Sequence, residues 1–226
     1  MYKYILFDAD NTLLDFDKSE KQALLATFDK FEIDKAYINE FSEINKSLWE
    51  LLEKNKILRD ELKIKRFELL LDKIDKEDIN AEEISNFYLS EIKKHSYTYD
   101  FSYYVCDKLK KMGKNLSIIT NGTKTVQIPR LSKSPIRPFF EHIFISEDLG
   151  VNKPSKAFFD AVLAVIEASP NECLIVGDSL TSDILGGINS KIDTVWFNPY
   201  EKINATNIIP TYTIKELKEL LKIVGE

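Results

Sequence analysis

The sequence predicts an α/β fold, a doubly wound parallel sheet with an all-helical module inserted after the first strand. From residue 115 onward, short apolar strands alternate with helical periodicity, which is typical of a parallel sheet covered by helices on both faces. Between residues 8 and 115 only helical patterns occur, although a crossover between parallel strands needs only about a dozen residues. That surplus of chain is enough for a separate module.

The first strand is the apolar start of YILFDADNTLLDFD, at residues 4–7. Four helical segments follow it, at residues 19–31, 37–55, 59–74 and 81–95. We therefore expect a core domain of residues 1–16 and 100–226 and a helical domain of residues 17–99. The many lysines and glutamates of the helical domain are the expected solvated faces of its helices.

The second half supplies the remaining strands, NLSIIT, HIFIS, ECLIVGD and DTVWF. The clearest helix between them covers residues 155–168 and is followed by Pro170. Its expected apolar face consists of Phe158, Phe159, Val162, Val165 and Ile166. The final TIKELKELLKIV predicts a closing amphipathic helix.

Composition excludes several functions. With 226 residues, 44% of them hydrophobic, the chain can bury a sizeable core and a smaller module. A net charge of −6 argues against a nucleic acid polymer as partner. No apolar run reaches the about 18 residues of a membrane span, and the first meets Asp8 too early for a signal peptide. We expect a cytoplasmic protein without a membrane partner, in which Cys106 and Cys173 are buried thiols.

Polar residues gather at the carboxyl ends of the predicted strands. Asp8 ends the first strand, Thr120 and Asn121 end NLSIIT, and Asp178 ends ECLIVGD, while Lys153 lies in a loop before a helix. Ligands of open α/β sheets bind at this edge, so these segments are expected to converge there. Clustered carboxylates repel one another unless a cation lies among them, and an oxygen-rich site suits Mg²⁺.

Four motifs in order, DADNT, TNG, the lysine of NKP and GDSLTSD, resemble those of the haloacid dehalogenase superfamily, in its phosphatase branch with a helical cap. NKSLW, ISEDLGVNKP and SDILGGIN further resemble the pyrimidine 5′-nucleotidases of this superfamily that remove noncanonical nucleoside monophosphates. The resemblance implies a Mg²⁺-dependent phosphomonoester hydrolase whose substrate is a small phosphate ester such as a nucleoside monophosphate. For the oligomeric state, we expect a monomer or a weak homodimer.

The resemblance also implies catalytic roles. Asp8 would be the nucleophile and form an aspartyl-phosphate. Asp10 would protonate the leaving alcohol and then deprotonate the attacking water. The carboxylates of Asp8 and Asp178 and the backbone carbonyl of Asp10 would hold Mg²⁺.

Other motif residues would support this chemistry. Thr120 and Asn121 would supply hydroxyl and backbone N–H donors to the phosphoryl oxygens, and Lys153 would offset negative charge. Thr12 would tie down the turn after Asp10. Asp183 would orient a metal-bound water or the lysine.

Substrate choice is expected to come from the cap, where Lys46 and Trp49 are candidate contacts with the substrate. The alternatives are that Lys46 belongs to the solvated surface and that Trp49 packs in the core of the helices. Asp10 argues against a 2-haloacid dehalogenase, because a halide leaves without a proton. A sugar phosphatase or phosphomutase of the same superfamily and a non-catalytic, metal-stabilised binding module stay open as alternatives.

One segment departs from the family pattern. The stretch after TNG carries Pro129, Pro135 and Pro138 where the family usually continues with an uninterrupted helix. A proline inside a helix removes a hydrogen bond and clashes with the preceding turn. We therefore expect a kinked or shifted helix next to Thr120 and Asn121.

Overall fold

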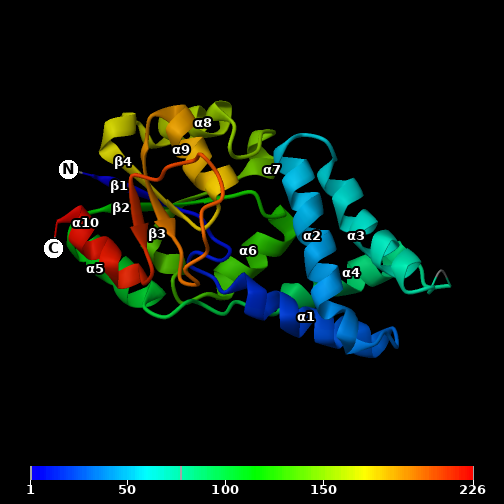
Figure 1. The fold of residues 1–226 in the computed structure, drawn as a ribbon. Coiled ribbons are helices and arrows are strands. Elements are labelled where there is room, and N and C mark those ends of the chain that lie inside the picture. Colours follow the sequence, from blue (N-terminus) through cyan, green and yellow to red (C-terminus); the bar gives the residue numbers. More distant parts are fainter. Residues whose placement is uncertain (1, 77, 226) are drawn as a thin grey trace. The chain divides into compact units, whose positions relative to one another are not determined.

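The computed structural model describes residues 2–76 and 78–225 (Figure 1). Its contacts divide the chain into two compact units, one formed by Met1–Phe16 with Tyr97–Glu226 and the other by Asp17–Ser96. The second boundary predicted from the sequence lies after residue 99. Residues 97–99 join the first unit because they pair with the turn after the first strand, where Asp15 N donates to Tyr97 O at 2.9 Å.

The first unit contains a six-stranded parallel sheet with the order β3-β2-β1-β4-β5-β6. The strands are β1 (Tyr4–Phe7), β2 (Asn115–Thr120), β3 (Phe140–Ile145), β4 (Cys173–Gly177), β5 (Asp193–Phe197) and β6 (Tyr212–Ile214). The chain proceeds outward from β1 to β3, returns to the other side of β1, and continues outward from β4 to β6. The predicted doubly wound sheet is confirmed, and its order reverses between β1 and β4, where such sheets bind ligands.

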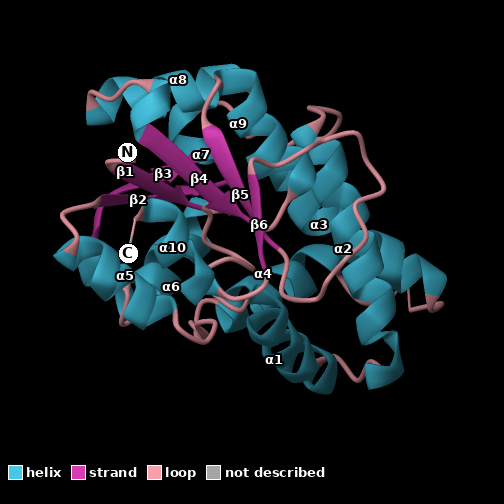
Figure 2. Ribbon diagram, turned by 60° about the vertical axis from the view of Figure 1, so that its left-hand side comes forward, coloured by secondary structure: helices cyan, strands magenta, loops and turns pink. Residues whose placement is uncertain are grey.

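Helices cover both faces of this sheet. Ile5 and Phe7 pack in one cluster with α5 (Ser102–Lys111) and α10 (Leu220–Val224), whereas Leu6 packs in another with α8 (Lys156–Ile166). Successive strand residues point to opposite faces, so neighbours in β1 enter different cores. Figure 2 shows α5 and α10 on one side of the sheet and α8 with α9 (Leu185–Ser190) on the other. Burial on both faces explains why these strands are continuous apolar runs.

Two expectations about this unit are wrong in detail. Val165 does not belong to the buried face of α8, because its side chain is 54% exposed. It lies roughly a quarter turn from the centre of the buried stripe. The predicted closing helix is interrupted, since Ile214 pairs with Phe197 as part of the edge strand β6 and only α10 is α-helical. A short 3₁₀ turn, Leu217–Glu219, joins the two.

The second unit consists of helices, as the sequence predicts. After α1 (Phe16–Lys30) come a 3₁₀ turn (Lys35–Tyr37), α2 (Ile38–Glu53), α3 (Arg59–Lys73) and α4 (Ala81–Ile92). Phe41, Phe67 and Tyr88 form an aromatic cluster at its centre, with ring centroids 4.8 to 5.5 Å apart. Within the described residues, none of the helices is long and apolar enough to cross a membrane.

Both cysteines are buried, as expected, Cys106 in α5 and Cys173 at the start of β4. Burial raises the pKa of each thiol to about 12. They are therefore protonated at neutral pH and behave as small apolar side chains.

Candidate active site

Three carboxylates meet where the strand order reverses. Asp8 follows β1 and Asp178 follows β4, and Asp8 N donates to Val176 O at 2.9 Å, which extends the pairing of the two strands to the sheet edge. Asp183 comes from the π-helical turn that begins at residue 180. One oxygen from each of the three carboxylates lies within 4.8 Å of the others.

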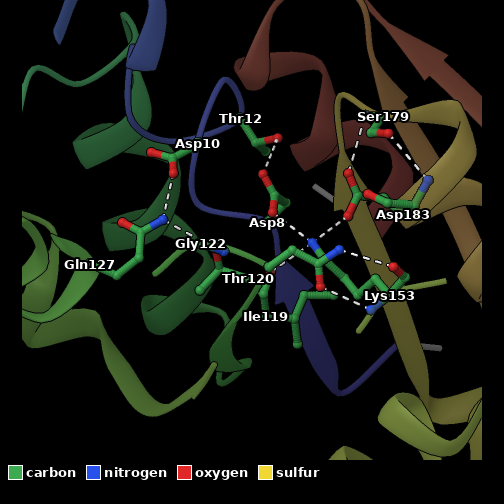
Figure 3. Close-up of polar contacts among 12 residues, drawn as sticks. Asp8, Asp10, Thr12, Ile119, Thr120, Gly122, Gln127, Lys153, Ser179 and Asp183 are labelled. Carbon is green, nitrogen blue, oxygen red and sulfur yellow. Dashed lines mark hydrogen bonds and ion pairs between the residues drawn. The ribbon is translucent and has the colours of Figure 1, made fainter. Parts of the chain in front are cut away.

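Lys153 lies against this carboxylate cluster (Figure 3). Its Nζ donates to Asp8 Oδ1 and to Asp183 Oδ1, at 2.6 Å each, and to Ile119 O at 3.0 Å. These contacts use all three N–H groups of the ammonium. Because the side chain is only 1% exposed, water screens these charges little.

The charges in the cluster do not balance. Burial raises the pKa of Asp8 well above its usual range; the Lys153 ammonium opposes this effect, while Asp183 and Asp178 add to it. Burial lowers the pKa of Lys153, but the carboxylates of Asp183 and Asp8 outweigh it, so that pKa is raised. One ammonium among three carboxylates leaves room for a further cation. A donor set made only of oxygens fits a hard divalent ion such as Mg²⁺.

Thr120, the last residue of β2, and Asn121, which follows it, form different hydrogen bonds. The side-chain amide of Asn121 holds the backbone of Lys153: Oδ1 accepts from Lys153 N and Nδ2 donates to Lys153 O, both at 2.9 Å. Thr120 Oγ1 accepts from Gly122 N at 3.0 Å and from Gln127 Nε2 at 3.2 Å. Neither of these contacts uses the hydroxyl hydrogen of Thr120, so this residue can donate to a phosphoryl oxygen.

Asp10 lies in a tight turn two residues beyond Asp8. Leu14 N donates to Ala9 O at 2.8 Å, and Asn11 adopts a left-handed backbone conformation with φ of 59°. An asparagine tolerates this conformation better than most residues, so the turn forms at little cost. The turn also buries Thr12, whose Oγ1 lies 3.5 Å from Asp8 Oδ2.

The carboxylate of Asp10 faces α6 (Lys124–Lys133). Its Oδ1 accepts from Arg130 Nη1 at 2.6 Å and its Oδ2 from Gln127 Nε2 at 2.5 Å (Figure 3 draws the Gln127 contact). Neither donor is among the site residues that the sequence motifs predict. The available signal was their spacing, because polar residues at positions i and i+3 share one helix face, here the face turned inward.

The three prolines affect α6 less than expected near the site. Pro129 lies inside α6 without ending it. The helix ends at Lys133, and Ser134 is extended, as is usual before a proline. Pro138 occupies the first turn of the next 3₁₀ helix. At the start of α6, Gln127 N donates to Thr123 O at 2.9 Å, so the helix is regular where it follows β2.

The two cap candidates belong to α2. Lys46 is exposed, whereas Trp49 is half-buried and packs against the cluster of Leu48, Leu52 and Leu62. The guanidinium of Arg59 lies 5.8 Å from the centre of the Trp49 ring. Packing thus explains Trp49 within the cap, and a contact of either residue with substrate stays a prediction.

Comparison with known proteins points to one family. A family model described as haloacid dehalogenase-like hydrolase matches residues 5–197. The HAD-hydrolase YfnB of Bacillus subtilis (strain 168) is 37% identical over 99% of this chain and 96% of its own length. Its crystal structure with bound magnesium aligns with a TM-score of 0.93 at 36% identity, covering 100% of this chain and 99% of that one.

Two further relatives carry substrate names. The pyrimidine 5′-nucleotidase PynA of Streptococcus pneumoniae (strain ATCC BAA-255 / R6) is 35% identical and covers 97% of this chain and 94% of its own length. The pyrimidine 5′-nucleotidase YjjG of Escherichia coli (strain K12) is 28% identical, with coverage of 97% and 96%. Both alignments extend over the core and the cap.

Proposed function

Because the chain belongs to the haloacid dehalogenase-like hydrolase family, as its motifs predict, we propose that it is a Mg²⁺-dependent phosphomonoester hydrolase acting through an aspartyl-phosphate. The observation that carries this proposal is the cluster of Asp8, Lys153, Asp178 and Asp183, buried except for the half-buried Asp178, which sets the proposed carboxylate nucleophile beside a fixed positive charge. An attacking carboxylate and a phosphoryl group are both anionic, so their approach requires such compensation.

We further propose how the chain holds the metal. The carboxylates of Asp8 and Asp178 and the backbone carbonyl of Asp10 are the ligands; bound there, Mg²⁺ supplies charge neutralisation at the phosphoryl oxygens. Asp183 supports the site, because its Oδ1 accepts from Lys153 Nζ and its Oδ2 accepts from Ser179 N at 3.1 Å. Both of its oxygens thus already have donors.

The reaction has two chemical steps. In the first, a carboxylate oxygen of Asp8 attacks phosphorus, the bond from phosphorus to the ester oxygen breaks, and Asp10 gives its proton to the leaving alkoxide. In the second, water attacks phosphorus and gives a proton to Asp10, the bond to Asp8 breaks, and phosphate leaves. The sum is ester plus water to alcohol plus phosphate, with both carboxyl groups restored. Thr120 donates to a phosphoryl oxygen throughout, while the ammonium of Lys153, held by Asp8, Asp183 and Ile119 O, offsets the negative charge on the transferring group.

The proposed substrate is a pyrimidine nucleoside monophosphate, including noncanonical ones. PynA and YjjG support this choice because their names state that substrate class and their likeness extends over the cap. A sugar phosphate is the competing substrate, and a sugar phosphomutase the competing reaction. The cytoplasmic location and the monomeric or weakly dimeric state also stay predictions.

Substrate screening of the purified protein tests the proposal. Nucleoside monophosphates, sugar phosphates and 2-haloacids are supplied with Mg²⁺ or with excess chelator, and released phosphate and halide are measured. We expect phosphate from pyrimidine nucleoside monophosphates, no turnover with chelator, and recovery with Mg²⁺ but not with the larger Ca²⁺. Halide release without any ester hydrolysis, or full turnover after chelation, contradicts the proposal.

A further inference from the structure

We propose that Arg130 and Gln127 are positioning residues that hold the carboxyl group of Asp10 in the orientation needed for proton transfer. This inference rests on the proposed function, which gives Asp10 its acid and base roles. Neither α6 residue belongs to the four sequence motifs; their involvement follows from their contacts alone.

Each oxygen of Asp10 has its own donor on α6. Arg130 Nη1 lies 2.6 Å from Oδ1, and Gln127 Nε2 lies 2.5 Å from Oδ2. A carboxylate held at one oxygen can still rotate about its last torsion, whereas donors on both oxygens fix its plane as well as its position. Proton transfer requires that the group lie within hydrogen-bond reach of the leaving oxygen, so this orientation matters for the rate.

The two donors also connect Asp10 to the phosphate-binding end of β2. Gln127 Oε1 accepts from Arg130 Nη1 at 3.2 Å, and Gln127 Nε2 donates to Thr120 Oγ1 at 3.2 Å as well as to Asp10. Gln127 therefore fixes the distance between the carboxyl group of Asp10 and the hydroxyl of Thr120, which is proposed to bind the phosphoryl group. Their spacing of three residues on α6 keeps both donors on one face of the helix.

Burial favours a functional role over a purely structural one. Arg130 and Gln127 are fully buried, and the guanidinium of Arg130 stacks 5.3 Å from the ring centre of Phe16. Burying a guanidinium costs free energy that its ion pair only partly offsets, and apolar residues of similar size often stabilise a core better. The side chain of Asp10 is 25% exposed, so the residue that this buried pair holds is itself only partly buried.

The test compares leaving groups that differ in their need for an acid. Arg130→Met and Gln127→Met remove the hydrogen-bond donors while roughly keeping the side-chain volume. Arg130→Lys keeps the positive charge but loses the planar guanidinium. The control, Lys133→Met, removes a positive charge from an exposed site of the same helix. Each variant is assayed with Mg²⁺ on a pyrimidine nucleoside monophosphate and on 4-nitrophenyl phosphate. Steady-state rates and the first-turnover release of nitrophenolate are measured.

Loss of positioning predicts an unequal effect on the two esters. With Arg130→Met and Gln127→Met, kcat on the nucleotide should fall about 10- to 100-fold, part of what general acid–base catalysis contributes. First-turnover release of nitrophenolate, which leaves without a proton, should fall less and appear as a burst before slow turnover. Arg130→Lys should lie between Arg130→Met and the unaltered protein, and Lys133→Met should match the latter.

A double-mutant comparison separates positioning from a general loss of structure. Added to Asp10→Asn, Arg130→Met should lower kcat by less than about threefold, because its effect passes through the group already removed. Equal losses on both esters, or full additivity with Asp10→Asn, would overturn the inference while leaving the proposed function standing. If the unaltered protein hydrolyses neither ester, the proposed function itself fails. Should Arg130→Met not fold, Gln127→Met decides by the same criteria.

Discussion

The ammonium of Lys153 lies 2.6 Å from Asp8 Oδ1, and both side chains are almost wholly buried. A buried ion pair contributes little net stability, but removing one partner leaves an uncompensated charge. In this protein Asp183 lies at the same distance from Lys153, so the lysine keeps a carboxylate when Asp8 changes. The nucleophile can therefore be replaced without leaving a buried ammonium alone.

Asp8→Asn should abolish phosphate release while the protein stays folded. The amide has nearly the same shape as the carboxylate but neither attacks phosphorus nor carries charge for Mg²⁺. Phosphate release from the best substrate of the screen measures the first effect, and circular dichroism with thermal unfolding the second. Retention of more than a few per cent of the activity would remove Asp8 from the nucleophile role.

The raised pKa of Asp8 predicts how Mg²⁺ and pH act together. A carboxyl group whose pKa is higher in the folded than in the unfolded chain binds protons better when folded. Protonation of Asp8 therefore stabilises the metal-free folded protein at pH values below the pKa that the group has in the unfolded chain. This stabilisation is lost as the pH rises through the higher pKa of the folded chain. Mg²⁺ binds the ionised carboxylate, so the stabilisation that Mg²⁺ provides should grow with pH.

Thermal unfolding measures this linkage. The midpoint Tm is compared with and without saturating Mg²⁺ from about pH 5 to about pH 8. The gain in Tm should rise across this interval, and Asp8→Asn, which carries no titrating group at that position, should flatten the rise. A gain that is constant or falls with pH would contradict this account of the site.

A buried polar network predicts the stability of the cap unit. Asn45 links two buried charges: its Nδ2 donates to Glu20 Oε1 at 2.8 Å, and its Oδ1 accepts from Arg66 Nη1 at 3.2 Å. Asn45→Leu should lower the free energy of unfolding by about 2 to 3 kcal/mol, because both partners lose a hydrogen bond in the interior. Urea unfolding measures the change, with exposed Ser47→Ala as a control that should alter it by less than about 0.5 kcal/mol. A loss no larger than that of the control would contradict the linking role.

The strand-end residues could be predicted because their positions follow from topology. Asp8 and Asp178 each follow an apolar run, and parallel strands bring their carboxyl ends to one edge whatever the details of the loops. Thr120 also ends an apolar run, whereas Lys153 was expected at this edge as a loop residue before a helix. The hydrogen bonds between the side-chain amide of Asn121 and the backbone of Lys153 depend on loop geometry and could not be predicted in this way.

The parts that sequence reasoning missed depend on long-range packing. Arg130 and Gln127 look like ordinary polar helix residues until α6 turns that face toward Asp10, a contact across more than 100 positions of sequence. The edge strand β6 escaped notice for a related reason: Ile214 lies in a helical pattern, but pairing beside β5 gives it a partner that local periodicity does not reveal.

Gly122 offers an independent way to move Gln127. A Cβ atom at this glycine would overlap the side chain of Gln127, including its Cγ and Cδ atoms, so Gly122→Ala should push that amide away from Asp10 and Thr120. We expect kcat on a nucleoside monophosphate to fall about 10-fold or more, within the range that general acid–base catalysis contributes.

The matched background for this substitution is Gln127→Ala, which removes the atoms that the new methyl group would meet. Gly122→Ala should then cost little further activity, so the two substitutions should be strongly non-additive in kcat. Steady-state kinetics of the two single variants and the double variant give this coupling, and thermal unfolding shows whether each remains folded. If Gly122→Ala lowered kcat by the same factor in both backgrounds, its effect would lie in the backbone of the TNG turn and not in the placement of Gln127.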